Sequence, residues 1–270
     1  MSDELRDTLV ETAAQGRAFL KRQIIRLSGI SNFEYSCADS SQIFFVQATA
    51  PDKDRSQVYV RAGYGDDKFP NDFTFWKINV SGNFKGKGLG LAAVKATLGL
   101  AYEKSAPAIF LSTVRDDGPE FWPLLGAVPL YEPVTLATEI DEALKRNAAV
   151  LPPGSDAYEE ISRIRDTAKK NPYLGFRELA RCNVMLPSRK LPDGFPFRSI
   201  VFKHLCENTD MVIIPSEPDT RLMLHDKLGE IPVFPPFKSK DHPTCAKICA
   251  ALAGNGGASA PFIGQRASAG

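Results

Sequence analysis

The residues best suited to chemistry form a glycine-rich segment, Lys85-Gly86-Lys87-Gly88-Leu89-Gly90, between an apolar strand-like run and an apolar helix-like run. Glycine at alternate positions leaves backbone N–H groups exposed where the helix is expected to begin. The first N–H groups of a helix lack intrahelical partners, and the helix dipole favours an anion there. Lys85 and Lys87 add positive charge. The segment therefore predicts a site for the pyrophosphate of a cofactor or substrate.

Two rival explanations of this segment stay open, and a third is excluded. An ordinary strand-to-helix turn also needs small residues. A dinucleotide-binding turn would use Asp116 as its acidic ribose partner, although the spacing Gly86-x-Gly88-x-Gly90 is incomplete for it. A Walker loop is excluded because Gly88, rather than Ser or Thr, follows Lys87.

The elements around the segment follow from apolar periodicity. Apolar residues at helical spacing predict one long helix or two over residues 3–28. Runs rich in β-branched and aromatic residues, separated by short polar turns, predict antiparallel strands at 42–47, 57–64 and 73–80. After the glycines the pattern predicts, in order, a helix at 89–104, a buried strand at 108–114, a short helix at 119–125 and a strand at 127–131.

The second half of the chain has a different, mainly helical pattern. Helices are predicted around Leu136–Leu144, from a capping box formed by Asp156 and Glu159, and at Leu174–Cys182. A loop at Pro187–Pro196, strands at Ser199–Leu205 and Met211–Ile214, and a helix at Thr220–Leu228 are expected to follow. This divides the chain into a core, residues 1–132, a helical insertion or extension with a returning strand, residues 133–237, and a flexible tail, residues 238–270.

Composition narrows the class of protein. A formal net charge of +1 argues against a broad nucleic-acid-binding surface. The sequence has no secretory signal pattern and no apolar run long enough to cross a bilayer, so we expect no membrane partner. Five scattered cysteines indicate reduced thiols and a cytoplasmic location, although signal-independent export fits equally. His242, Cys245 and Cys249 offer only three ligands, so no metal site is predicted.

The order of elements and two motifs resemble the GNAT (GCN5-related N-acetyltransferase) superfamily over residues 73–131. The first motif of that family is a Val on the central strand and, five positions further on, Arg or Gln-x-x-Gly-x-Gly. Val80 and Lys85-Gly86-Lys87-Gly88-Leu89-Gly90 occupy those positions here, with Lys85 in place of Arg or Gln. The second motif, an aromatic helix ending in Leu-Gly-Phe before a strand, is matched in outline by residues 121–130.

The resemblance implies an α/β fold with a mixed, largely antiparallel sheet flanked by helices, and acetyl-coenzyme A as acyl donor. The loop amides would hold its pyrophosphate, and the edge of the preceding strand would pair with its pantetheine arm. The implied coenzyme-binding residues are Ile78, Val80, Lys85, Gly86, Lys87, Gly88, Leu89, Gly90 and Leu91. The implied activity is transfer of an acyl group, most simply acetyl, to an amine by direct attack.

Two departures from the family concern catalysis. Trp122 stands where many members have a Tyr that protonates the leaving thiolate, and residues 73–77 lack the Glu that many members use as a base. Candidate replacements are Asp116, Asp117, Glu120 and Tyr131. The losses also leave open a catalytically inactive module that retains the fold and binds a protein. The long region after residue 132 favours a protein or other bulky amine as acceptor over a small amine.

Overall fold

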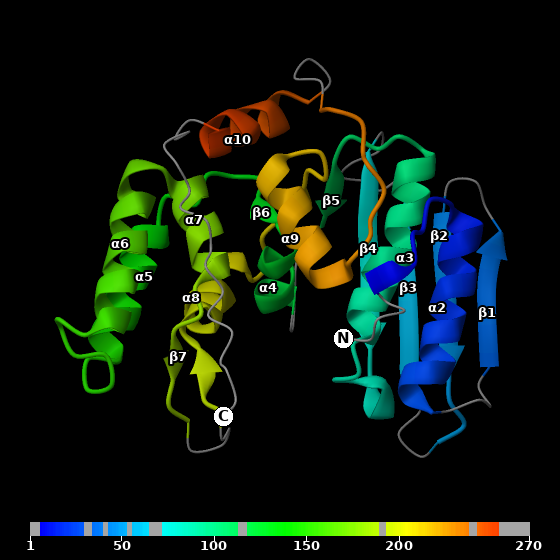
Figure 1. Ribbon diagram of the computed structural model, residues 1–270, viewed down its shortest axis with the longest axis horizontal. Helices are drawn as coiled ribbons and strands as arrows, with labels where there is room; N and C mark the ends of the chain where they lie inside the picture. Colours follow the sequence, from blue (N-terminus) through cyan, green and yellow to red (C-terminus); the bar gives the residue numbers. More distant parts are fainter. Residues whose placement is uncertain are drawn as a thin grey trace, which may run out of the picture.

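A mixed seven-stranded sheet organises the described part of the chain (Figure 1). The computed structural model describes residues 6–29, 34–39, 43–52, 56–64, 72–112, 118–188, 193–237 and 242–253. The strand order is β1 (Glu34–Asp39), β2 (Ile43–Thr49), β3 (Gln57–Gly63), β4 (Phe73–Val80), β5 (Ile109–Leu111), β9 (Met211–Ile213) and β6 (Val128–Pro129). Only the pairing of β4 with β5 is parallel. The predicted α/β class with a mixed, mostly antiparallel sheet is thereby confirmed.

Helices α2 (Ala13–Ser28) and α3 (Leu89–Glu103) pack together over one face of β2 and β3 (Figure 1). Alternate residues of these strands are buried, as a sheet with one covered face requires. Two glycines let the helices approach closely. A Cβ at Gly16 would lie 2.1 Å from the Ala96 carbonyl oxygen, and one at Gly99 would lie 2.6 Å from that of Thr12.

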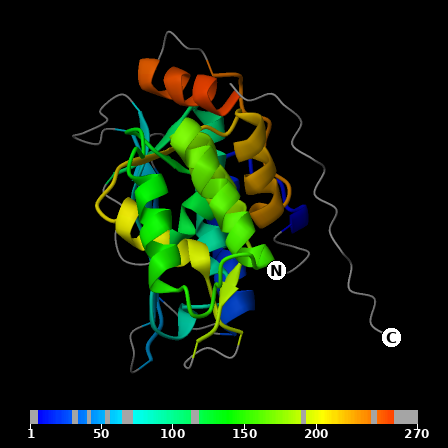
Figure 2. The same cartoon turned by 90° about the vertical axis from the view of Figure 1, so that its left-hand side faces the viewer.

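A second group of helices fills the side of the molecule beyond β5 (Figures 1 and 2). It consists of α5 (Leu136–Arg146), α6 (Asp156–Lys170), α7 (Pro172–Arg181) and α8 (Phe197–Cys206), with a small hairpin of β7 (Met185–Leu186) and β8 (Phe195–Pro196). Strand β9 then pairs with both β5 and β6. The helical segment is therefore bounded at both ends by strands of the same sheet.

A buried arginine on α7 connects this helical segment to α9 (Pro218–Leu228), the helix that follows β9. The Arg177 side chain, 2% exposed, donates to Thr220 Oγ1 over 3.0 Å and forms an ion pair with Glu217 over 3.5 Å. Lys95 has a similar role on α3, donating to the carbonyl oxygens of Leu228 and Arg6. Within the described residues, no helix combines the length and apolarity needed to cross a bilayer.

Several predicted elements are corrected by the structure. Ser199–Leu205, expected as a strand, lies within α8, because Pro196 precedes a run whose buried residues recur on one helical face. Strand β1 was not expected, and β8 occupies the end of the predicted loop at Pro187–Pro196. The cap of α6 is Ser155, whose hydroxyl accepts from the Tyr158 N–H, rather than a box of Asp156 and Glu159.

The predicted tail also contains a helix. Residues 243–253 form α10 (Pro243–Ala253), which buries Cys245 and Ile248. The remainder of the predicted tail, residues 254–270, lies outside the described residues.

Candidate functional site

The site begins where β4 and β5 separate. Their pairing joins Phe73–Phe75 to Ile109–Leu111 and covers no later residue of β4. The register between β3 and β4 shifts after Phe75. Ala62 pairs with Phe75 and Arg61 pairs with Lys77, so Trp76 is the extra residue of a bulge. A bulge bends its strand and increases the local twist. The remainder of β4 therefore presents one edge to the space between the two strands.

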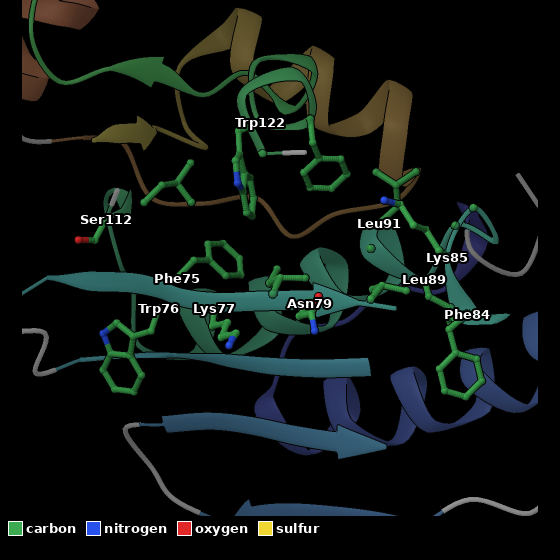
Figure 3. A pocket seen from close by; sticks show the side chains of 18 residues that line it. Phe75, Trp76, Lys77, Asn79, Phe84, Lys85, Leu89, Leu91, Ser112 and Trp122 are labelled. Carbon is green, nitrogen blue, oxygen red and sulfur yellow. The ribbon is translucent and has the colours of Figure 1, made fainter. Parts of the chain in front are cut away.

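That space is a cavity of about 940 Å³ which runs from the end of β5 to the start of α3. Its inner end is mostly apolar: Leu111 and three aromatic residues, Phe75, Phe121 and Trp122, line it together with Ser112. The Trp122 ring lies 5.3 Å from that of Phe75 and 5.1 Å from that of Phe121, measured between centroids. Figure 3 shows Trp122 pointing toward Phe75 across the cavity. This end can bury an apolar group and exclude water from it.

The other end of the cavity is the glycine loop. Gly86 and Gly88 have φ values of 77° and 79°, a left-handed conformation that favours glycine. A Cβ at either position would meet no atom within 4 Å, so the backbone there faces open space. Gly88 is the N-cap of α3, and neither a side-chain cap nor an acidic residue in the first turn competes for the free N–H groups. The loop can therefore present backbone donors to an anion.

A hydrogen-bonded cluster outside the cavity holds the start of this loop. The buried Ser56 hydroxyl donates to Asp52 Oδ2 over 2.6 Å and accepts from the Asn83 N–H over 2.6 Å. Asp52 also accepts from the Ser56 N–H and from the Asn83 side-chain amide. These hydrogen bonds, chiefly from Ser56, lower the pKa of Asp52. The turn between β2 and β3 thereby fixes η1 (Gly82–Phe84), the short helix that leads into the glycine loop.

Close packing reinforces that cluster. Gly82 has a φ of 59°, and a Cβ there would lie 2.4 Å from the Ser56 hydroxyl oxygen. No local pattern indicates the cluster, because Asn83 lies 27 positions after Ser56 and 31 after Asp52. Such contacts depend on the pairing of β3 with β4, which local patterns do not encode.

Most of the predicted coenzyme-binding residues meet in the cavity. Those that line it are Ile78, Val80, Lys85, Gly86, Gly88, Leu89, Gly90 and Leu91. Lys87 does not line it. Its ammonium group instead donates to the Ser28 carbonyl oxygen over 3.2 Å, at the C-terminus of α2, where a cation is favoured by the helix dipole.

Of the predicted acid–base candidates, the two that the structure describes do not line the cavity. Glu120 is exposed on α4 (Gly118–Phe121), and Tyr131 is 74% exposed after β6; neither lines the cavity. Asp116 and Asp117 lie outside the described residues. Among the described residues that line the cavity, none carries a carboxylate, an imidazole or a phenol. The Ser112 hydroxyl, which the sequence did not single out, is the polar group at its inner end.

The described residues contain no group of His, Cys, Asp or Glu side chains arranged to hold a metal ion. Comparisons with protein-family models, with curated proteins and with solved structures found no match to this chain. Function is therefore inferred from the site itself.

Proposed function

We propose that the protein binds an acyl-coenzyme A and transfers its acyl group, most simply acetyl, to an amine. The observation that carries the proposal is the cavity between the separated strands β4 and β5, which joins an apolar aromatic end to an uncapped helix N-terminus. A ligand that combines a diphosphate with a long, mostly uncharged thiol arm matches both ends. The resemblance of the two sequence motifs to the GNAT superfamily supports the same ligand.

Each part of the cavity would have a distinct role in binding. The N–H groups of Gly88, Leu89 and Gly90 would donate hydrogen bonds to the diphosphate, with Lys85 adding charge. The free edge of β4 at Ile78 and Val80 would pair with the amide groups of the pantetheine arm, as an added strand pairs with a sheet edge. The bound thioester supplies an activated acyl group.

The chemistry would depend mainly on positioning. An amine nitrogen attacks the thioester carbonyl carbon, so a C–N bond forms and the C–S bond breaks. The nitrogen loses a proton and the sulfur gains one. Phe75, Phe121 and Trp122 would hold the thioester and exclude water from it, which favours transfer over hydrolysis. Ser112 also lines this end of the cavity, and its hydroxyl would pass a proton through water.

The acceptor is proposed to be a protein or another bulky amine. The helical segment between β6 and β9 adds a large body beside the cavity, on the far side of β5 from β1–β4 (Figure 1). This body provides surface for contacts well beyond a small amine.

A second candidate function is a catalytically inactive module that binds the coenzyme and a protein. One observation favours it: the described lining of the cavity carries no carboxylate, imidazole or phenol that could act as an acid or base near neutral pH. Both candidate functions use the same coenzyme site, and only the first includes transfer of the acyl group.

Two measurements on the purified full chain separate these possibilities. Coenzyme A at a hundredfold excess over its dissociation constant should stabilise the fold by about 2.7 kcal/mol. For a chain of this size that raises the melting temperature by roughly 5–10 °C. Intact-mass spectrometry of peptide and protein acceptors incubated with acetyl-coenzyme A then detects transfer. Stabilisation without any mass increase would favour the inactive module, and absence of stabilisation would refute both candidates.

A matched pair of glycine variants tests whether the stabilisation by coenzyme A depends on the glycine loop. Gly88→Ala and Gly154→Ala both place a Cβ in open space at a positive φ, 79° and 85° respectively. Both should therefore cost similar stability without ligand, about 1–2 kcal/mol. Only Gly88→Ala should reduce the stabilisation by coenzyme A, because Gly154 lies in a turn outside the cavity.

A further inference from the structure

The face of β2, β3 and β4 opposite α2 and α3 carries an ordered set of aromatic and cationic side chains. On β2, Phe44 packs toward α2, where its ring would contact a Cβ at Gly16, so Phe45 points to the opposite face. Phe45 pairs in register with Arg61 on β3, and Arg61 pairs with Lys77 on β4. Paired residues share a face, so these three side chains form a row across the three strands.

Contacts with aromatic rings extend the row and hold its cations in place. The Arg61 guanidinium lies 4.7 Å from the centre of the Trp76 ring, and the Lys77 ammonium lies 5.6 Å from that of Tyr59. The rings of Phe45 and Tyr59 meet edge to face at 5.6 Å. We name this set, Phe45, Tyr59, Arg61, Trp76 and Lys77, the cationic row.

The cationic row has one sign of charge, and its two charged side chains are exposed over half-buried aromatic rings. Strands β2, β3 and β4 contain no Asp or Glu, and Arg61 and Lys77 are both exposed. A shallow depression of about 230 Å³ lies between Ile43, Phe45, Tyr59 and Arg61. An arginine that lies over an indole ring can still donate from its N–H groups to a carboxylate. The row therefore offers oriented donors to an anionic partner.

The cationic row also reaches the cavity. Trp76 and Lys77 belong to both, because the bulge places them at the edge where β4 separates from β5. Figure 3 shows both side chains on the side of β4 away from Trp122. A molecule bound on the row therefore lies beside the entrance to the proposed reaction site without occupying its aromatic end.

We propose that the cationic row docks an acidic, extended stretch of a polypeptide acceptor, a proposal that rests on the acyl-transfer function. Arg61 lies one strand, about 4.8 Å, from the edge of β4, and an extended peptide advances about 3.3 Å per residue. A carboxylate two to four residues from the reactive amine would therefore reach Arg61 while the amine enters the cavity. Tyr59 and Phe45 would pack against the apolar part of the same stretch.

The test uses direct binding and therefore does not depend on transfer. Two labelled synthetic peptides of equal length carry one reactive amine and differ only in having Glu or Gln at the second to fourth positions from it. Fluorescence anisotropy measures their affinity for the full chain, for Arg61→Gln and Lys77→Gln, and for Lys145→Gln, an exposed charge-matched control on α5. Stabilisation by coenzyme A is measured on all four proteins.

The Glu peptide should bind more tightly than the Gln peptide, and raised salt should reduce the difference. Arg61→Gln and Lys77→Gln should each reduce that preference by about threefold, as for a partly exposed ion pair, and Lys145→Gln should leave it unchanged. Equal affinity for both peptides, or a preference that survives both variants, overturns the inference. A loss of stabilisation by coenzyme A in Arg61→Gln also overturns the inference, because it would show that the cationic row binds the coenzyme. Failure of wild-type protein to bind coenzyme A refutes the transfer function instead, whatever the peptides show.

Discussion

Removal of one buried hydroxyl should weaken coenzyme binding from outside the cavity. In Ser56→Ala, the Asn83 N–H loses its acceptor and Asp52 loses its strongest donor, and residue 56 is fully buried. Asn83 is exposed and its hydrogen bond to Ser56 is part-buried, so the loss costs about 0.5–1.5 kcal/mol. Because this hydrogen bond fixes η1, part of the cost falls on ordering the glycine loop. An ordering cost of about 1 kcal/mol would weaken coenzyme A binding by a factor of about 5.

A second serine provides the matched control. Ser155 caps α6, and its hydroxyl accepts from the Tyr158 N–H over 3.3 Å. Ser155→Ala should cost about 1 kcal/mol of stability, as a lost N-cap does. Isothermal titration calorimetry with coenzyme A should show weaker binding for Ser56→Ala and unchanged binding for Ser155→Ala. Wild-type affinity in a folded Ser56→Ala protein would refute the role given to the cluster.

Three further outcomes concern the fold. Gly99→Ala should destabilise the protein by about 1–3 kcal/mol in urea unfolding, because its Cβ would lie 2.6 Å from the Thr12 carbonyl oxygen. An unchanged midpoint of urea unfolding would show that α2 and α3 separate freely. Burial lowers the pKa of Lys95 from 10.5 to about 8, so the unfolded state binds more protons between these values. The stability of the wild type relative to Lys95→Met should therefore rise with pH from about 8 upward, and a constant difference would contradict the shift. Burial raises the pKa of Cys206 to about 12, whereas Cys37 is exposed. A thiol reagent should therefore modify Cys37 rapidly and Cys206 only on unfolding. Equal rates of modification at the two cysteines would contradict the burial of Cys206.

The elements that carry the site were predictable from sequence because their signals are local. The run Phe73–Val80 and the helix that starts at Leu89 match the structure at their boundaries, since an apolar strand, a glycine turn and an apolar helix follow one another directly. Strand β9 was predicted as a returning strand, but its position between β5 and β6 depends on pairing across distant parts of the chain.

The differences between these expectations and the structure also have physical causes. The run Ser199–Leu205 contains residues that favour strands, yet tertiary packing of Phe202 and its helical neighbours places it in α8. Lys87 was assigned to the phosphate site from its spacing, which cannot reveal that the end of α2 lies within its reach. Tyr131 was named because its strand was expected to enter the site, and β6 ends before it.

A crystal structure of the protein grown with saturating coenzyme A most directly tests the central claim. Density for the diphosphate should lie against the backbone N–H groups that follow Gly88, with the thiol arm along the free edge of β4 toward Trp122. A cavity that stays empty of coenzyme, or that fills with side chains of this chain, would contradict the account.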